Sequence, residues 1–261
     1  MGLVEVTLDP RGVAVVTLSR AEKHNALSAE MMVELHEMAD RLGQDPSVRV
    51  VVLAGAGRSF CAGADLGWMQ EQMEADAEGR AASARTLAHM LMAWNLLPKP
   101  VIGRVQGNAF GGGVGLMAVC DVVVAVESAR FAFTETRLGL IPATIGPYIL
   151  ARLGEGKARR VFMSARAFAA EEARELGLVA RVVAADELDA AVEAEVAPYL
   201  ACAPGAVAAA KAEARRMGPV IDEAAIEASI AALVACWETG EAREGVAAFF
   251  EKRRADWVID S

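Results

Sequence analysis

The segment from Val101 to Leu116, VIGRVQGNAFGGGVGL, decides the expected fold because it joins a buried strand to a glycine-rich turn. Its first five residues, 101–105, form a short run with three β-branched side chains and follow two prolines, which is typical of a β-strand. The three glycines Gly111–Gly113 let a ligand atom approach the backbone. They also stand where a helix begins, and the first N–H groups of a helix have no partner within it. We therefore predict a ligand-facing loop here.

A second predicted strand, Val48–Leu53, is also followed by a loop of small residues, Cys61–Asp65. Two such loops side by side could place two N–H donors on one oxygen atom. In an enzyme, removing one such donor typically costs about 3–4 kcal/mol of transition-state stabilisation. Each loop taken alone is better explained as an ordinary packing turn.

Strands and helices alternate through the first 200 or so residues, which predicts an α/β layer architecture. Strands are expected at 13–18, 48–53, 101–105 and 121–126. A helix is expected between the N-cap Ser28 and a stop at Gly43, and a mostly helical stretch at 66–97. From Asp186 onward, alanine, glutamate and leucine dominate, which predicts three or four helices.

The charge balance argues against nucleic acid as a partner. The 261 residues include 26 Lys and Arg against 35 Asp and Glu, a formal net charge of −9, whereas nucleic-acid binders usually present a basic face. The four cysteines show no CxxC spacing and only three histidines are present, so no metal site is predicted. We see no signal peptide and no membrane span, which favours a soluble, cytoplasmic protein.

Glu135 is the candidate acid–base residue. It follows Phe131 and Phe133 and precedes Leu138, and burial among such side chains raises the pKa of a carboxyl toward neutrality. Arg137, two residues on, could oppose that change or bind a substrate carboxylate. The alternative is an ordinary exposed glutamate at a strand end.

Several segments, in this order, resemble the crotonase superfamily of enoyl-CoA hydratases and isomerases over nearly the whole chain. They are Arg20–Leu27, Phe60–Leu66, Gly107–Gly113, Leu138–Pro142 and Phe249–Arg253. The resemblance implies a crotonase-like spiral of repeated ββα units in residues 1–200. It also implies a helical C-terminal trimerisation region in residues 201–261, and a homotrimer or a dimer of trimers.

Carried over by position, the resemblance implies that the N–H groups of Ala64 and Gly112 form an oxyanion hole for a thioester oxygen beside Glu135. Coenzyme A would enter as part of the substrate, with no permanently bound cofactor and no metal. The implied CoA contacts are Lys23, Ala26, Ala62, Asp65, Leu66 and Lys252, the last from a neighbouring subunit. Trp68 would line the acyl pocket, although a place in the core is the simpler expectation for it.

Gly115 departs from the pattern of the two-glutamate hydratases, which carry their first catalytic glutamate at this position. Three functions therefore compete. The first is a hydratase for a branched acidic enoyl-CoA, because residues 135–148 resemble methylglutaconyl-CoA hydratases and Arg137 could face the substrate carboxylate. The second is a double-bond isomerase, which needs a single carboxylate. The third is a non-catalytic nucleotide- or RNA-binding protein, which the acidic balance disfavours; a dehydrogenase is equally remote, since Leu116 replaces the last glycine of a dinucleotide fingerprint.

Overall fold

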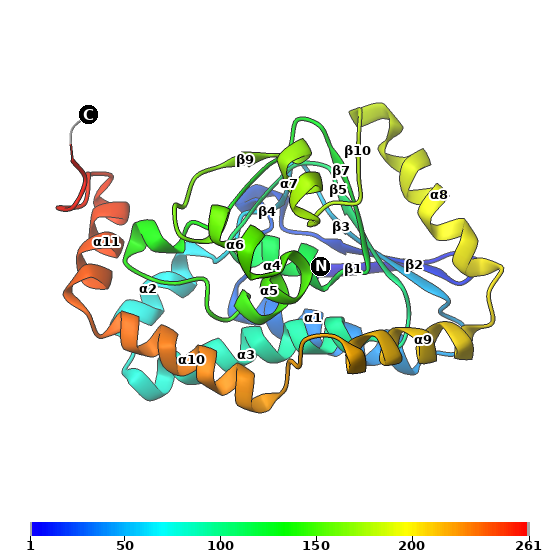
Figure 1. Ribbon diagram of the computed structural model, residues 1–261, viewed down its shortest axis with the longest axis horizontal. Coiled ribbons are helices and arrows are strands. Elements are labelled where there is room, and N and C mark those ends of the chain that lie inside the picture. The colour runs from blue at the N-terminus through cyan, green and yellow to red at the C-terminus, as the bar shows by residue number, and fades with distance from the viewer. Residues whose placement is uncertain (1, 260–261) are drawn as a thin grey trace.

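The computed structural model describes residues 2–259 and contains two sheets with helices packed around them (Figure 1). The larger sheet has the strand order β1-β2-β3-β5-β7-β10, in which β1 is antiparallel to β2 and the remaining neighbours are parallel. These strands are β1 (Val4–Leu8), β2 (Val13–Leu18), β3 (Val50–Gly55), β5 (Val101–Val105), β7 (Val122–Val126) and β10 (Arg181–Val183). Every residue of β3 is buried, as expected for a parallel strand covered on both faces.

The smaller sheet has the order β4-β6-β8-β9. Its strands are β4 (Ser59–Cys61), β6 (Asn108–Phe110), β8 (Arg130–Ala132) and β9 (Phe168–Ala169). Three consecutive turns of the chain each contribute one strand to the large sheet and the next strand to the small one: β3 then β4, β5 then β6, β7 then β8. Helices follow each pair. This is the spiral of repeated ββα units expected of a crotonase-like fold.

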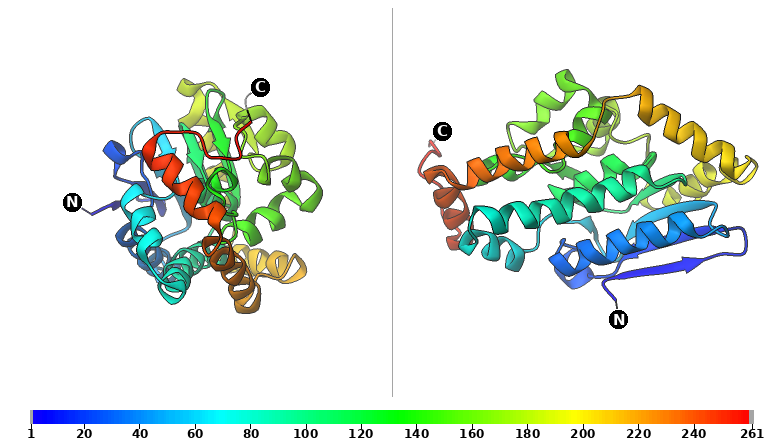
Figure 2. Two further views of the ribbon diagram at one scale, coloured as in Figure 1. Left: turned by 90° about the vertical axis from the view of Figure 1, so that its left-hand side faces the viewer. Right: turned by 90° about the horizontal axis from the view of Figure 1, so that it is seen from below.

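Helices surround the two sheets, and the C-terminal helices lie at the periphery of the molecule. They are α1 (Ala29–Gln44), α2 (Leu66–Glu74), α3 (Ala77–Leu96), α4 (Gly112–Val119), α5 (Gly146–Leu153), α6 (Glu155–Phe162), α7 (Ala170–Leu176), α8 (Leu188–Leu200), α9 (Pro204–Met217), α10 (Glu223–Trp237) and α11 (Gly240–Glu251). Short 3₁₀ turns lie at Ala21–Lys23 (η1), Glu135–Leu138 (η2) and Ala185–Glu187 (η3). Seen from below in Figure 2, α3 lies between α1 and α10, and it packs against both.

The apolar stripe of α1 explains how this layer is fixed. Met31, Leu35 and Leu42 recur at helical spacing and are buried against the core. Trp94 of α3 is completely buried there, and its indole N–H donates to the Leu35 carbonyl at 3.0 Å. The polar end of a large buried ring is thereby satisfied, as burial requires.

Some predicted element boundaries were wrong. α1 continues through Gly43 to Gln44, and the N–H of its C-cap residue, Asp45, still donates to the Arg41 carbonyl. The stretch 66–97 is two helices, interrupted where the Asp76 side chain accepts the Gly79 N–H and starts α3 anew. Four helices follow residue 187, within the predicted number. Within residues 2–259, none of the helices combines the length and the apolar character that crossing a membrane would require.

Candidate active site

Three loops meet at one edge of the small sheet. β4 runs parallel to β6, and β6 parallel to β8, so their carboxyl ends lie together. The loops that leave these ends carry Ala64, Gly112 and Glu135 respectively. A hydrogen bond of 2.9 Å from the Gly111 N–H to the Ala132 carbonyl joins the second loop to the third. Strand ends of this kind are where α/β proteins commonly bind ligands.

Glycines allow the first two loops to touch. A methyl group on Gly113 would lie 2.3 Å from the Cys61 carbonyl oxygen, and one on Gly63 would lie 2.8 Å from the Phe110 oxygen. Gly63 also has a φ of +91°, which side chains rarely tolerate. The methyl position on Gly63 is also 3.7 Å from the backbone nitrogen of Gly112. Gly63, the residue before Ala64, therefore adjoins the start of α4.

The N–H groups of Ala64 and Gly112 are both unengaged in the part of the chain that the structure describes. Ala64 pairs with Leu27 in an isolated parallel bridge, in which the Leu27 N–H donates to Gly63 and the Asp65 N–H donates to Leu27. The Ala64 N–H therefore faces away from Leu27. Gly112 is the first residue of α4, where N–H groups have no intrahelical acceptor.

Glu135 opens the 3₁₀ turn η2, immediately beyond Thr134. A methyl group on Gly111 would lie 3.0 Å from Glu135 Oε1, so this oxygen rests against the second loop. Oε2 is buried and has no hydrogen-bond partner in residues 2–259. Burial raises the pKa of Glu135 to about 7, although the backbone N–H groups of Glu135 and Thr134 oppose the change. Near neutral pH such a carboxyl can both accept and donate a proton.

Asn25 organises the segment that precedes the first loop. It is fully buried, and its Nδ2 donates to the carbonyls of Ala56 and Ser59 at 2.9 and 2.8 Å. Its Oδ1 accepts the Arg20 N–H at 3.0 Å. Asn25 adopts a left-handed φ of 55°, a conformation that asparagine tolerates better than most residues. Sequence reasoning missed this role, although an asparagine beside a predicted binding segment was a usable signal.

Five of the predicted CoA residues lie around the bridge between Leu27 and Ala64. Lys23 is exposed at the end of η1, Ala26 is buried and Ala62 is partly buried. Asp65 caps α2 by accepting the Gly67 and Trp68 N–H groups, and it also pairs with Arg20 at 2.8 Å. Leu66, the first residue of α2, is about half exposed.

The remaining predicted residues are dispersed. Lys252 is exposed at the end of α11, on a different element from the other CoA residues. Trp68 is partly buried against the main core, on the first turn of α2. Arg137 is exposed, and its guanidinium has no hydrogen bond or ion pair with any residue in 2–259.

Gly115 is closed to any side chain. A methyl group there would lie 2.5 Å from Ile145 Cγ2 and 3.1 Å from Ile145 Cβ. Ile145 is buried in the core just before α5, so it cannot easily give way. Sequence analysis identified the missing glutamate but not the residue that occupies its space.

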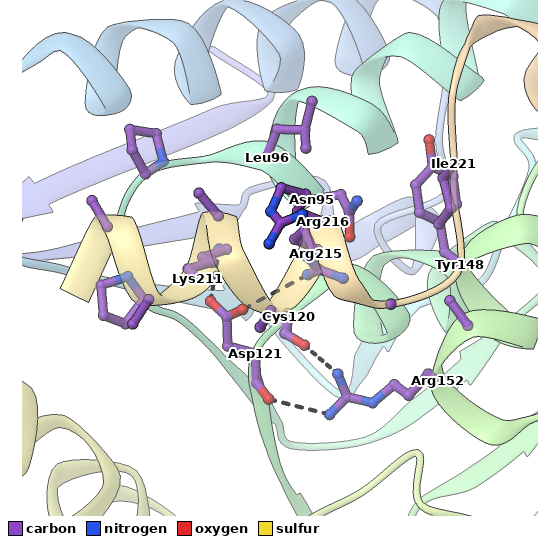
Figure 3. A pocket seen from close by; sticks show the side chains of 18 of the residues that line it. Asn95, Leu96, Cys120, Asp121, Tyr148, Arg152, Lys211, Arg215, Arg216 and Ile221 are labelled. Carbon is purple, nitrogen blue, oxygen red and sulfur yellow. Dashed lines mark hydrogen bonds and ion pairs between the residues drawn. The ribbon is translucent and has the colours of Figure 1, made fainter. Parts of the chain in front are cut away.

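A cavity of about 1030 Å³ lies elsewhere, between α9 and the C-terminal ends of α3, α4 and α5 (Figure 3). Lys211 of α9 reaches Asp121 at 2.7 Å and the Lys99 carbonyl at 3.0 Å. Arg152 donates to the carbonyls of Cys120 and Asp121. These cations are thus held by groups of the chain itself: Lys211 anchors α9 to the segments before β5 and β7, and Arg152 joins α5 to the end of α4. The cavity contains none of the predicted site residues; it adjoins the far end of α4, about 10 Å from Gly112 at 1.5 Å per residue.

Glu135 is partly buried, with its Oε2 fully enclosed and its pKa raised, and it lies beside unengaged backbone N–H groups. These features suit an acid–base enzyme that acts on a carbonyl compound. The comparisons agree. Residues 9–259 match the family model described as enoyl-CoA hydratase/isomerase. The crotonyl-CoA hydratase of Syntrophomonas wolfei is 34% identical over 249 residues, covering 94% of each chain. The short-chain-enoyl-CoA hydratase of Clostridium acetobutylicum is 33% identical over 259 residues, covering 98% of each chain.

Solved structures of enoyl-CoA hydratases have the same fold. The crystal structure of an enoyl-CoA hydratase from Mycobacterium smegmatis superposes with a TM-score of 0.79 at 37% identity, covering 98% of this chain and 99% of that one. The chain therefore belongs to the enoyl-CoA hydratase/isomerase family, the crotonase superfamily, and is an enzyme of that family.

Proposed function

We propose that the chain hydrates an α,β-unsaturated acyl-CoA thioester, or catalyses the reverse dehydration, and that its acyl group is of the branched glutaconyl type. The observation that carries the proposal is the place of Glu135. Its Oε1 lies against Gly111, one residue from the N–H of Gly112, while its Oε2 is buried and has no hydrogen-bond partner among residues 2–259. The named activities of the two relatives above support the reaction class.

In the proposed reaction the Ala64 and Gly112 N–H groups donate to the thioester oxygen. The carbonyl is thereby polarised, the β-carbon becomes electron-poor, and the α-carbon can take up a proton. A water oxygen bonds to the β-carbon, the carbon–carbon double bond becomes single, and the product is a 3-hydroxyacyl thioester. Each of the two donors would supply about 3–4 kcal/mol of transition-state stabilisation.

Glu135 would move both protons. As a carboxylate it accepts a proton from the attacking water, and as a carboxylic acid it returns a proton to the α-carbon, so it leaves the cycle unchanged. No second acid can stand at position 115, because Ile145 fills the space next to Gly115. A substrate carboxylate would then help to orient the water, which is the reason for favouring an acidic acyl group.

Arg137 is the proposed counter-charge for that substrate carboxylate. Its guanidinium is exposed and uncommitted in residues 2–259. In a 3₁₀ turn of three residues, side chains two apart point about 120° from one another. On this proposal Arg137 would reach the distal end of the acyl group, while Glu135 flanks the carbonyl.

A double-bond isomerase is the second candidate, and the contact between Gly115 and Ile145 favours it. An isomerase removes a proton from one carbon and returns it to another, so one carboxylate is sufficient and no water has to be oriented. The oxyanion hole would stabilise the dienolate formed between the two steps.

A substrate panel separates the candidates. We expect 3-methylglutaconyl-CoA to be hydrated, and Arg137→Ala to lower its kcat/KM by about 10- to 100-fold, the usual worth of a charge-assisted hydrogen bond. Crotonyl-CoA should be unaffected by that change. Turnover of a cis-3-enoyl-CoA alone would establish the isomerase, and an equal loss on crotonyl-CoA would remove Arg137 from acyl recognition.

We also propose that the chain forms trimers, or dimers of trimers, through residues 201–261, with Lys252 approaching the CoA phosphates of a neighbour. Its exposure, and its place on an element apart from the other CoA residues, support this arrangement. Sedimentation equilibrium tests the assembly. Mixing Lys252→Ala subunits with Glu135→Gln subunits tests the shared site, since a site built from two subunits would regain activity in the mixture.

A further inference from the structure

Arg80, in the first turn of α3, joins three helices. Its Nε donates to the Gln72 carbonyl at 2.8 Å and one Nη to the Met73 carbonyl at 3.3 Å, both in the last turn of α2. Its guanidinium also pairs with Glu238 and lies 5.4 Å from the ring centre of Trp237, both at the end of α10. The side chain is only 12% exposed, so these contacts are partly shielded from solvent.

α2 depends on such anchors because it buries little of itself. Within its nine residues only Met69 and Gln72 are buried. The carbonyls at a helix C-terminus lack intrahelical partners and carry partial negative charge, so a cation placed there is stabilising. At the other end, α2 begins directly after Ala64 and Asp65 and carries Trp68 in its first turn. Displacement of α2 therefore changes the mouth of the proposed site.

Trp237 connects the same junction to the turn that carries Glu135. It belongs to an apolar cluster with Leu140 and Val246, and Leu138 packs at its margin. Leu140 in turn donates its N–H to the Glu135 carbonyl at 3.1 Å. Helix α11 packs closely against η2, since a methyl group on Gly245 of α11 would lie 2.5 Å from the carbonyl carbon of Leu138.

We infer that Arg80 and Trp237 form a positioning pair, which holds α2, with Ala64 before it and Trp68 in it, at a fixed distance from the Glu135 turn. The inference rests on the proposed function, because its expected effects on KM and kcat/KM require that the chain turns over an enoyl-CoA. The C-terminal helices of a subunit then help to shape that subunit's own site. Neither residue touches the reacting atoms, so both act through α2 and η2.

The test compares Arg80→Met with Arg85→Met. Arg85 lies on the same helix and also pairs with α10, through Glu227, but within residues 2–259 no hydrogen bond or ion pair joins it to α2, so it is the matched control. We expect Arg80→Met to raise the KM for enoyl-CoA and lower kcat/KM by about 10-fold or more. Arg80→Lys should recover part of this loss, because it keeps the charge but cannot span all the acceptors. Arg85→Met should have the kinetics of the unchanged protein.

Hydrogen exchange of the backbone amides in residues 66–74 gives a readout that does not require turnover. Faster exchange in Arg80→Met than in Arg85→Met, at equal thermal stability, supports the positioning role. Unchanged exchange together with an unchanged KM overturns it. So does an activity loss in Arg80→Met that is explained entirely by a smaller amount of folded protein, with KM unchanged. If no enoyl-CoA is turned over by the unchanged protein, the proposed function fails while the exchange experiment still decides the structural inference.

Discussion

Replacing Glu135 by glutamine should stabilise the protein at alkaline pH while removing its activity. Burial raises the pKa of Glu135 from the ordinary 4.5 to about 7. The folded state therefore holds this proton more tightly than the unfolded chain does, and stability falls as pH rises from about 4.5 to 7. One pKa unit corresponds to 1.36 kcal/mol, so above pH 7 the ionised carboxylate lowers the free energy of unfolding by about 3 kcal/mol. Glutamine has the shape of the protonated acid and avoids that cost.

Thermal unfolding measured at pH 5 and pH 8 tests this reasoning. The gain in unfolding free energy should be about 1 kcal/mol at pH 5 and about 3 kcal/mol at pH 8. For a chain of this size, 3 kcal/mol corresponds to a rise in Tm of roughly 6–12 °C. Glu127→Gln is the control, because it makes the same substitution at an exposed position directly after β7. A Glu135→Gln protein that is no more stable than the unchanged chain at pH 8 would refute the buried, desolvated carboxyl.

Three other changes probe separate parts of the structure. Gly115→Ala should cost about 1–3 kcal/mol, because its methyl group meets Ile145, and adding Ile145→Ala should cost less than the sum of the two single changes in urea unfolding. Asn25→Ala should cost about 3 kcal/mol and raise the KM for CoA thioesters, since three carbonyls before the first loop lose the hydrogen bond from Asn25; an unchanged KM would separate this loop from CoA binding. Lys211→Met should lower stability by about 2 kcal/mol through its lost pair with Asp121 but leave kcat unchanged, and altered steady-state kinetics would contradict our separation of cavity and site.

Much of the large sheet and the helical layer was predictable from local patterns. β2 and β5 are short runs rich in β-branched residues, which are typical of strands, and α1 carries its buried residues at helical spacing. The small sheet was not predicted, because β4, β6 and β8 are each three residues long, too short to show the alternating pattern of a strand. Their pairing, which is a long-range property, is what brings the three loops together.

The sequence by itself determined which residues could do chemistry: a glutamate set among aromatic side chains, two glycine-rich loops after strands, and a glycine at position 115. Only the tertiary structure decided how they meet. Parallel pairing of β4, β6 and β8 sets the loops at one edge, Ile145 closes the space beside Gly115, and Arg80 joins α2 to α10. The strand pairings, the contact of Gly115 with Ile145 and the pair of Arg80 with Glu238 all join residues far apart in the chain, and local composition carries no information about such contacts.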